Sequence, residues 1–483
     1  MSISVNLTLS NPQFDIFTST KDINLMLSGV GGGKTTEGGL LSANYIRYFP
    51  YVRGFIGANT YEQLTTSTLI RMRAFWKEYF KWENNIHYVV GIKPPNNFNL
   101  EYHNFDEYHN IISFANGGVI YKGSLEKYLV HEGKEFGWAI LDETKDTREE
   151  AVKEVILARL RQFGMYLDKN NELTSEKTDN PFNPLYITTS PAKVDWINDW
   201  FNIDDYETEI LELIYNEKTY FKKSFADKFM TISSTYHNQA NLPKNYIKRI
   251  YDNNTKENAD RLIFGNPYLK AGGEFYSSFD RMIHVKDVEY IEYLPVHISF
   301  DFNVAPYITM LLFQIKDNGN IKEIRCFDEI CLSNPNNKTD KLCRYFLNKY
   351  KDKLNGLFYY GDATGRAAST SSDKHNYDII KRELRPYLNN YSSRVPFANP
   401  FVNARRDFIN EIFENKYPLR ALIDRKCKKT IADFEFVRED ENGNKLKRRI
   451  KDKLSEQTYE KYGHTSDAWD YFYCQAFKKY FKT

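Results

Sequence analysis

The sequence has no apolar stretch long enough to cross a membrane, and its first residues lack the cationic segment, apolar run and cleavage site of a secretion signal. Cysteine is scarce: the five cysteines all lie in the last third of the chain and include no CxxC pair. These absences argue against a membrane protein, a disulfide-stabilised scaffold and a zinc site. We therefore expect free thiols in a reducing cytoplasm.

The chain also lacks a strong net charge. Its 66 lysines and arginines and its 64 aspartates and glutamates leave a charge of +2 over 483 residues. This balance argues weakly against a protein that coats nucleic acid with its entire surface. Repeats and long low-complexity tracts are absent, and the length predicts two or three domains, each able to bury a core.

Short apolar runs that end in polar loops dominate the first half. Because helical patterns lie between them, they predict a buried parallel sheet with strands at 23–27, 54–58, 138–141 and 185–189. Asn116-Gly117 sits between two β-rich arms and predicts a hairpin. Apolar side chains at helical spacing predict a helix over 149–163, and the polar stretch 167–183 is typical of an inserted loop.

The glycine-rich segment 28–36, SGVGGGKTT, follows the first predicted strand and opens a helix, which is the setting of a phosphate-binding loop. Lys34 would place a positive charge at the β and γ phosphates, and the Thr35 hydroxyl would ligate Mg²⁺. Ser28 stands where the strict pattern has glycine, but a small residue still permits the turn. The predicted nucleotide-binding residues of the loop are Gly29, Gly31, Gly32, Gly33, Lys34, Thr35 and Thr36.

A second predicted strand, residues 138–141, is followed by two acids, which we expect at the same edge of the sheet as the phosphate-binding loop. Asp142 would hold Mg²⁺ through water, and Glu143 would orient and deprotonate the attacking water. The strand 185–189 brings Thr188, Thr189 and Ser190 there as well, either to sense the γ-phosphate or as ordinary strand-end caps. Arg159 and Arg161 are open to two interpretations, an arginine finger or solvated and ion-paired side chains.

The second half carries three widely spaced aspartates. Asp301 and Asp362 each follow a predicted strand, and Asp467 lies near the start of the last helix. If the fold brings them together, they can hold two Mg²⁺ or Mn²⁺ ions for phosphodiester cleavage, because clustered carboxylates need a counter-charge. Three further groups stay open as members of that site: Asp470, Glu329 and His464.

The order of these motifs along essentially the whole chain resembles the large terminase subunit of tailed bacteriophages. The motifs that carry the resemblance are GVGGGKTT, WAILDE, ITTSP, ISFDFN, YYGDATG and HTSDAWDY. The resemblance implies an α/β chain: a P-loop NTPase domain of the additional-strand ATPase type with a parallel sheet, followed by an RNase H-like nuclease domain. It assigns Lys34 and Thr35 to Walker A, Asp142 and Glu143 to Walker B, and Thr189 and Ser190 to the coupling motif. Asp301, Asp362 and Asp467 become the nuclease metal ligands.

The resemblance also implies how the protein works. ATP hydrolysis would drive double-stranded DNA into a procapsid, and the endonuclease would cut concatemeric DNA at initiation and termination. The implied partners are DNA, a portal protein and a small terminase subunit, with a homo-oligomeric ring forming at the portal vertex in the host bacterial cytoplasm and no membrane involved. The basic segments 425–429 and 445–453 would attract the DNA backbone.

Two positions depart from the family pattern. Val30 occupies the place where many members have an arginine in the Walker A loop. The adenine-contacting glutamine is matched only by Gln13, which lies far upstream. The domains we expect are an ATPase at 1–255, a junction at 256–285 and a nuclease at 286–483.

Two other functions stay open. A cellular DNA repair or processing ATPase-nuclease of helicase type should contain helicase motifs and a second RecA-like domain, and the second half has neither a second phosphate loop nor a second Walker B. A DNA-binding scaffold with decayed motifs is disfavoured by the intact Lys34, Glu143 and three aspartates.

Overall fold

The computed structural model describes residues 7–191, 194–268, 273–366, 375–389, 391–440, 442–446, 449–451 and 458–481. The chain divides into two compact units, Met1–Leu269 and Lys270–Thr483. Within the described ranges, no helix combines the length and the apolar character needed to cross a membrane. All five cysteines are free thiols.

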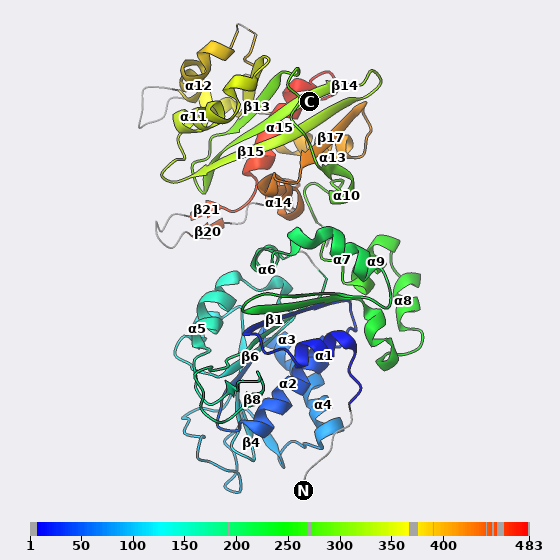
Figure 1. The fold of residues 1–483 in the computed structure, drawn as a ribbon, viewed down its shortest axis with the longest axis vertical. Helices are drawn as coiled ribbons and strands as arrows, with labels where there is room; N and C mark the ends of the chain where they lie inside the picture. The colour runs from blue at the N-terminus through cyan, green and yellow to red at the C-terminus, as the bar shows by residue number, and fades with distance from the viewer. Residues whose placement is uncertain are drawn as a thin grey trace. The chain divides into compact units, whose positions relative to one another are not determined.

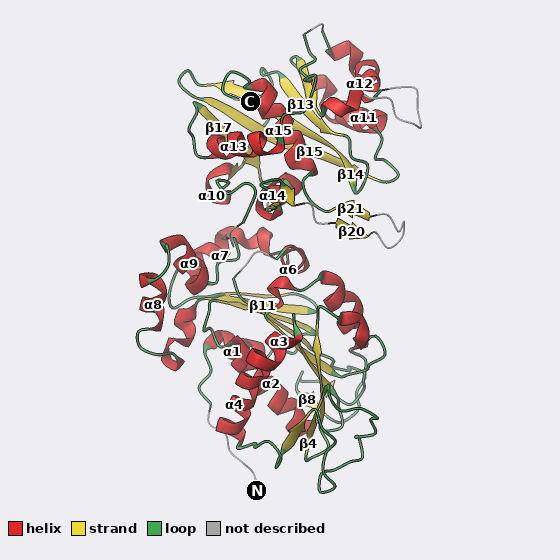
Figure 2. Cartoon of the chain, turned by 180° about the vertical axis from the view of Figure 1, so that it is seen from behind, coloured by secondary structure: helices red, strands yellow, loops and turns green. Residues whose placement is uncertain are grey.

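The first unit is built on a nine-stranded sheet, shown in Figures 1 and 2. The strand that leads into the phosphate loop, β1, is separated from β6, which carries Asp142, by β9, and all three run parallel. This inserted strand is the feature that defines an additional-strand ATPase, so that fold prediction is confirmed. In sheet order, the strands are β10 (Phe221–Ser224), β11 (Lys228–Ser233), β1 (Ile23–Ser28), β9 (Leu185–Thr189), β6 (Trp138–Asp142), β2 (Gly54–Ala58), β5 (Val119–Ser124), β4 (Ile111–Phe114) and β3 (Tyr88–Val90).

Both faces of this sheet are covered by helices. Met26 of β1 packs into one core with α1 (Asn11–Phe17), α2 (Lys34–Tyr48) and α4 (Leu69–Phe80). Its neighbours Leu25 and Leu27 point to the opposite face and pack with α6 (Asp195–Phe201) and α7 (Glu207–Ile214). β1 is therefore buried on both sides, which explains why its sequence is a nearly continuous apolar run.

The local predictions in this unit have mixed outcomes. The hairpin at Asn116-Gly117 is confirmed, because β4 and β5 pair antiparallel. The helix predicted over 149–163 is too long: a π-helix at Ala151–Ile156 continues as α5 (Leu157–Arg159) and ends there. The chain leaves the helix because the backbone N–H of Arg161 donates to the carbonyl of Phe136 at 3.2 Å, and Phe163 is left 69% exposed. The inserted loop contains a small hairpin of β7 (Tyr166–Leu167) and β8 (Leu173–Thr174).

Part of the expected junction at 256–285 packs against the phosphate loop. It includes α9 (Lys256–Phe264), where the carbonyl of Leu262 accepts a hydrogen bond of 2.7 Å from the backbone N–H of Val30. This helix belongs with the first unit, so its start at 256 is not the start of a linker. Farther along, Phe275 and Tyr276 are buried in a core of the second unit.

The second unit is built on a six-stranded mixed sheet. β13, β14 and β15 form an antiparallel meander, and β16 pairs parallel to β13 on its other side. This order, 3-2-1-4 in the meander's own numbering, is that of an RNase H-like core, as predicted. The strands are β12 (Val285–Lys286), β17 (Leu419–Asp424), β15 (Lys322–Ser333), β14 (Tyr307–Asp317), β13 (Val296–Asp301) and β16 (Leu357–Gly361).

Helices cover this sheet on both faces too. The last helix, α15 (His464–Ala476), lies against the central strands with α13 (Val402–Phe413) and α14 (Lys428–Phe436) beside it (Figure 2). On the opposite face are α11 (Thr339–Tyr350) and α12 (Asn376–Leu384). Smaller elements are α3 (Tyr61–Gln63), the π-helix η1 (Leu64–Thr68), α8 (Tyr246–Asp252), α10 (Arg281–His284), β18 (Arg438–Glu439), β19 (Lys445–Leu446), β20 (Arg449–Lys451) and β21 (Thr458–Glu460).

One buried acid in the first unit is unpaired. Glu37 of α2 is 1% exposed, and neither of its carboxyl oxygens has a hydrogen-bond partner among the described residues. Burial raises the pKa of Glu37 well above its ordinary value. The folded state then holds this proton more tightly than the unfolded chain, so the stability of the unit should fall as pH rises above the unfolded pKa toward the folded one.

Glu37→Gln should therefore stabilise the first unit at pH 8 by about 1–3 kcal/mol, and by less at pH 5, because the amide never ionises. Urea unfolding followed by tryptophan fluorescence tests this, since five of the six tryptophans, all but Trp469, lie in this unit. The exposed Glu78→Gln of α4 is the control. Identical pH dependence of stability in the wild type and Glu37→Gln would contradict the prediction.

Candidate functional site

The phosphate-loop candidate has the backbone shape that its glycines permit. Gly31 and Gly33 have φ angles of 77° and 86°, in the left-handed region that disfavours other residues. A side chain on Gly32 would collide with Ser28, and one on Gly33 would meet the Gln13 amide. The loop thus has no room for side chains at these positions, and α2 begins directly after it at Lys34.

Lys34 is buried and faces the acids of β6. Its ammonium donates to the carbonyl oxygens of Ser28 at 2.9 Å and Gly29 at 3.2 Å, and it lies 3.7 Å from a carboxylate oxygen of Glu143. Burial lowers the pKa of Lys34, while the charges of Glu143 and Asp142 oppose that effect. The side chain is therefore held at the mouth of the loop as a desolvated cation, which suits contact with phosphate.

Three threonine hydroxyls donate to the carboxylate of Asp142. Thr188 donates at 2.7 Å, Thr68 at 2.7 Å and Thr35 at 3.2 Å. Thr35 comes from the start of α2, Thr188 from β9 and Thr68 from the π-helix η1. Asp142 is 2% exposed, so these hydroxyls replace the water that would otherwise solvate its charge.

Glu143 is held beside Asp142 in an uncommon backbone conformation, with φ at 52°. Non-glycine residues with such angles are often found at functional sites. Its carboxylate accepts hydrogen bonds from the Ser190 hydroxyl at 2.6 Å and the Ser190 backbone N–H at 3.1 Å. Thr189 is fully buried, and its hydroxyl donates to the Ser190 carbonyl instead. On β9 and directly after it, the side chains that contact the acids are thus Thr188 and Ser190.

Residues distant in sequence support the loop from behind. Gln13, buried at 3% exposure on α1, donates to the carbonyl of Gly33 at 3.3 Å. Asn238 donates to the carbonyl of Gly31 at 2.7 Å, and the Thr235 hydroxyl donates to that of Val30 at 2.8 Å. These contacts hold the carbonyls of the loop in place, and the backbone N–H groups of Gly29 and Val30 are held in turn by the carbonyls of Ser233 and Leu262.

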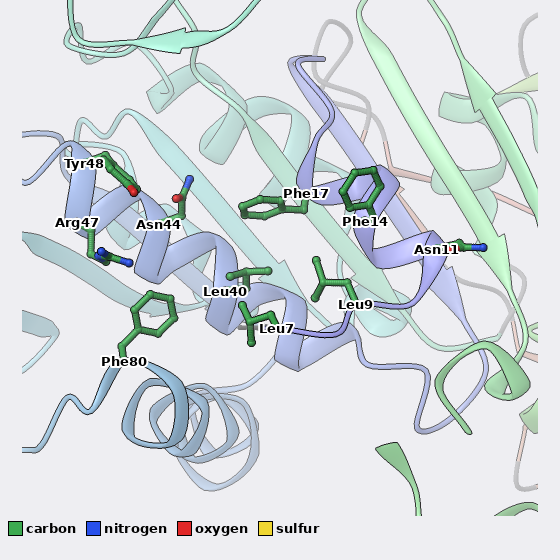
Figure 3. Close-up of a pocket in the computed structure, with 10 residues that line it drawn as sticks. All are labelled: Leu7, Leu9, Asn11, Phe14, Phe17, Leu40, Asn44, Arg47, Tyr48 and Phe80. Carbon is green, nitrogen blue, oxygen red and sulfur yellow. The ribbon is translucent and has the colours of Figure 1, made fainter. Parts of the chain in front are cut away.

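A pocket of about 590 Å³ in the first unit is separate from this site (Figure 3). It is bounded by α1, the later turns of α2 and the end of α4, where Phe14, Leu40, Arg47 and Phe80 line it. None of the predicted phosphate-binding residues reaches it.

Of the two arginines considered as an arginine finger, Arg161 forms an ion pair with Glu135 at 3.4 Å on the surface.

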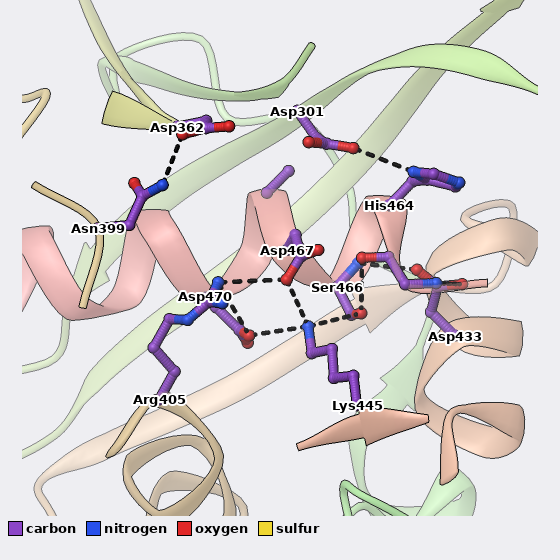
Figure 4. A network of polar contacts seen from close by, with 12 residues as sticks. Asp301, Asp362, Asn399, Arg405, Asp433, Lys445, His464, Ser466, Asp467 and Asp470 are labelled. Atoms are coloured by element: carbon purple, nitrogen blue, oxygen red, sulfur yellow. Dashed lines mark hydrogen bonds and ion pairs between the residues drawn. The ribbon is translucent and has the colours of Figure 1, made fainter. Parts of the chain in front are cut away.

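The three aspartates of the second unit occupy neighbouring positions on its sheet and last helix (Figure 4). Asp301 ends β13, is 3% exposed, and lies 3.2 Å from Nδ1 of His464. Burial raises the pKa of Asp301, the charges of Asp467 and Asp362 add to the increase, and the His464 hydrogen bond opposes it. Burial is the largest influence on His464 and lowers its pKa, but the hydrogen bond and charge of Asp301, with the Glu460 carbonyl and Asp433, together raise the pKa. The carboxylate of Asp301 thus lies within the electrostatic influence of the other two.

Asp362 follows β16 and is held by a neighbouring loop. Its carboxylate accepts from the Asn399 amide at 2.6 Å and from the backbone N–H and hydroxyl of Thr364 at 2.8 and 2.6 Å. Asn399 also accepts from the backbone N–H of Ala363 at 2.9 Å. The amide therefore ties Asp362 and the residue after it to one fixed position.

Asp467 is engaged by two buried cations. Lys445 of β19 donates to it at 2.8 Å and to Asp470 at 3.0 Å, and Arg405 of α13 donates to Asp467 at 3.2 Å. Asp470 is fully buried and also accepts from the Tyr276 hydroxyl at 2.9 Å. Asp470 thus belongs to an ion-pair cluster behind Asp467. In Figure 4, Asp467 lies between this cluster and the other two aspartates.

The remaining candidates have structural partners. Glu329 accepts from the backbone N–H groups of Lys429 and Thr430 at 2.8 Å each, at the start of α14. Asp433 likewise accepts from the Gly463 and Ser466 backbone N–H groups at the start of α15. Within the described ranges, no three His, Cys, Asp or Glu side chains are close enough to form a metal cluster. The oxygen donors of Asp301 and Asp362 nevertheless suit Mg²⁺ or Mn²⁺, with Asp467 shared with its cations.

Comparison with known proteins gives matches only among solved structures: no family model and no curated protein matches the sequence. The large terminase of a thermophilic bacteriophage, solved in complex with ADP, is 17% identical with a TM-score of 0.36, and the match covers 97% of this chain and 100% of that one. The HK97 bacteriophage large terminase is 12% identical with a TM-score of 0.38, covering 91% and 90%. The P22 large terminase nuclease domain is 12% identical with a TM-score of 0.30, covering 43% and 94%. TM-scores below 0.5 assign no role to any residue here.

The structure corrects one sequence interpretation and adds partners that no motif indicated. The basic segment 445–453 was expected to face DNA, but Lys445 is buried and neutralises two aspartates; residues 447, 448, 452 and 453 lie outside the described ranges. In 425–429 the basic residues are exposed and Cys427 is buried. Sequence reasoning missed Thr68, Arg405 and Asn399, because each is far from its acid along the chain.

Lys445→Met should destabilise the second unit by about 3–5 kcal/mol, since it leaves two buried carboxylates with Arg405 as the remaining cation. Hydrogen–deuterium exchange of peptides from α15 measures this, and we expect faster exchange throughout the helix. Adding Asp470→Asn should recover part of the loss by removing one of the two negative charges. Lys416→Met, at an exposed surface pair, is the control. Unchanged α15 exchange in Lys445→Met would show that the cluster does not stabilise the helix.

Proposed function

We propose that this chain is the large subunit of a DNA-packaging terminase. Its first unit hydrolyses ATP and moves double-stranded DNA into a procapsid, and its second unit is a metal-dependent endonuclease that cuts concatemeric DNA at initiation and termination. One observation carries the proposal: a single chain joins a phosphate loop facing Asp142 and Glu143 across an inserted strand to an RNase H-like sheet with aspartates at its strand ends.

The geometry of the first unit supports ATP hydrolysis. Thr35 and Asp142 present oxygen donors at one place, a set that suits Mg²⁺, which would supply charge to neutralise the phosphates. Lys34 would exchange the carbonyls it now contacts for phosphate oxygens. Glu143, fixed by Ser190, would accept the proton of the attacking water.

The contacts of β9 support coupling between hydrolysis and movement. Thr188 donates to Asp142 and Ser190 to Glu143, so a change at either acid is transmitted to the segment after β9. A nucleotide can bias such a segment only through contacts that differ before and after hydrolysis. Loss of the γ-phosphate would alter the position of Glu143 and hence that of Ser190.

The second unit supports phosphodiester cleavage. Asp301 and Asp362 would hold a divalent ion directly, and Asp467 would contribute once its contacts with Lys445 and Arg405 relax. The ion would supply a nucleophilic hydroxide and stabilise the leaving oxygen. His464, hydrogen-bonded to Asp301, would fix the orientation of that carboxylate.

The RNase H-like second unit also disfavours a helicase-type repair enzyme, which needs a second RecA-like sheet in that place. DNA, a portal protein, a small terminase subunit and further copies of the chain in a ring are the partners that a terminase large subunit requires. Mn²⁺ would substitute for Mg²⁺ in the nuclease.

Lys34→Ala in the full chain should lower ATP turnover at least about 100-fold, because it removes the cation that faces the phosphates. It should leave Mn²⁺-dependent cleavage of plasmid DNA intact. Phosphate release and gel analysis of plasmid measure the two activities on the same preparation, with the exposed Lys77→Ala as control. Full ATPase activity in Lys34→Ala would contradict the assignment of residues 28–36 as the phosphate-binding loop.

Asp362→Ala should have the reciprocal effect: loss of plasmid cleavage by about 100-fold or more with ATP turnover unchanged, because one metal-binding carboxylate is gone. Asp378→Ala, an exposed aspartate of α12, is the matched control. Undiminished cutting by Asp362→Ala would remove this residue from the metal site.

A further inference from the structure

Two phenylalanines beside Asp362 are almost completely exposed. Phe397 is 97% exposed and Phe401 is 84% exposed, on the loop that follows α12 and leads into α13. Asn399, which donates to Asp362, lies midway between them. Large apolar side chains are rarely presented to water in this way without a binding partner.

The loop that carries them is anchored. The backbone N–H of Arg394 donates to the carbonyl of Tyr359 on β16 at 2.9 Å, and the Arg366 guanidinium donates to the carbonyl of Val395 at 2.8 Å. Pro396 and Pro400 further restrict the backbone next to each phenylalanine. The two rings are therefore presented at low entropic cost, a property of preorganised binding groups.

Two arginines lie at this loop, Arg366 and Arg394. The next two along the chain, Arg405 and Arg406 of α13, are instead paired with acids. Arg366 lies over the Phe397 ring, 5.2 Å from its centroid, and Arg394 lies over the ring of Phe358 at 5.4 Å. Exposed aromatic rings interleaved with arginine are the composition that binds nucleic acid, because the rings stack on or wedge between bases while the cations attract the phosphates.

We propose that Phe397 and Phe401 insert at base steps of the DNA bound to the nuclease unit and so place the scissile phosphate at Asp362. This inference rests on the proposed nuclease function of that site and adds how the substrate is held. The four residues from one ring to the other span at most about 14 Å, or about four base steps, so both rings reach the same short stretch of duplex. Insertion of apolar wedges partly unstacks base steps and kinks the duplex.

The test uses the full-length protein with a 30-base-pair duplex containing 2-aminopurine, whose fluorescence rises when its base unstacks, in Ca²⁺ to slow cleavage. The wild type should raise the fluorescence, and Phe397→Ala/Phe401→Ala should abolish the rise and weaken binding about tenfold or more. The dependence of log K on salt should be unchanged, because phenylalanine neutralises no phosphate. Phe397→Trp/Phe401→Trp should restore the signal.

Two controls separate stacking from charge and from general damage. Arg394→Gln should reduce the salt slope by about one, whereas the phenylalanine variant should not. Tyr293→Ala removes a 68% exposed ring before the start of β13, at the opposite end of that strand from Asp301, and should change neither binding nor fluorescence.

The outcomes are distinguishable. If the wild type cuts DNA with Mn²⁺ and the double variant binds, unstacks and cuts equally well, the inference is wrong and the nuclease assignment stands. If sedimentation shows that the double variant loses self-association or binding of a protein partner at unchanged DNA affinity, the rings form a protein interface instead. If the wild type does not cut DNA at all, the proposed nuclease function fails and this inference fails with it.

Discussion

The structure depends on how it stabilises the buried carboxylates at the ends of its strands and helices. Asp142 and Asp467 are each less than 10% exposed, and each needs partners to offset the loss of hydration. The two units do so differently. Asp142 receives three neutral hydroxyls, which leave its charge available, whereas Asp467 receives two cations, which cancel it.

This difference between neutral and charged partners affects how each site would bind a metal ion. Hydroxyls that solvate Asp142 can shift by a rotamer, so in the proposed function the first site would admit Mg²⁺ and a nucleotide without rearranging a charged partner. At Asp467 a metal must share a carboxylate with Lys445 and Arg405, whose own charges would repel it. The second site is consequently the one in which substrate phosphate is most needed to favour binding of the metal.

The sequence predicted what is encoded locally. The loop at 28–36, the acids after β6 and the strand-end aspartates are each recognisable from neighbours in the chain, and apolar runs located their strands. The side chains that contact these acids could not be predicted. Thr68 meets Asp142 across 74 residues from within a π-helix, a form with no distinctive pattern. The predicted DNA-binding role of Lys445 failed because a run of basic residues looks the same whether its first member faces water or a buried acid.

The small net charge of the chain is consistent with these structural uses of its acidic residues. Because many acids are committed to strand ends and to buried pairs, the overall balance of 66 to 64 says little about any one surface. The loop that holds Asp362 in place, residues 388–401, carries one arginine and no acid, and its exposed Phe397 ring lies beside Arg366. Recognition of duplex there would combine weak phosphate attraction with contacts to base faces, which tolerate any sequence. The proposed motor, which would move DNA of every sequence past its nuclease, requires a grip of that kind, since base-specific hydrogen bonds would stall it at preferred sites.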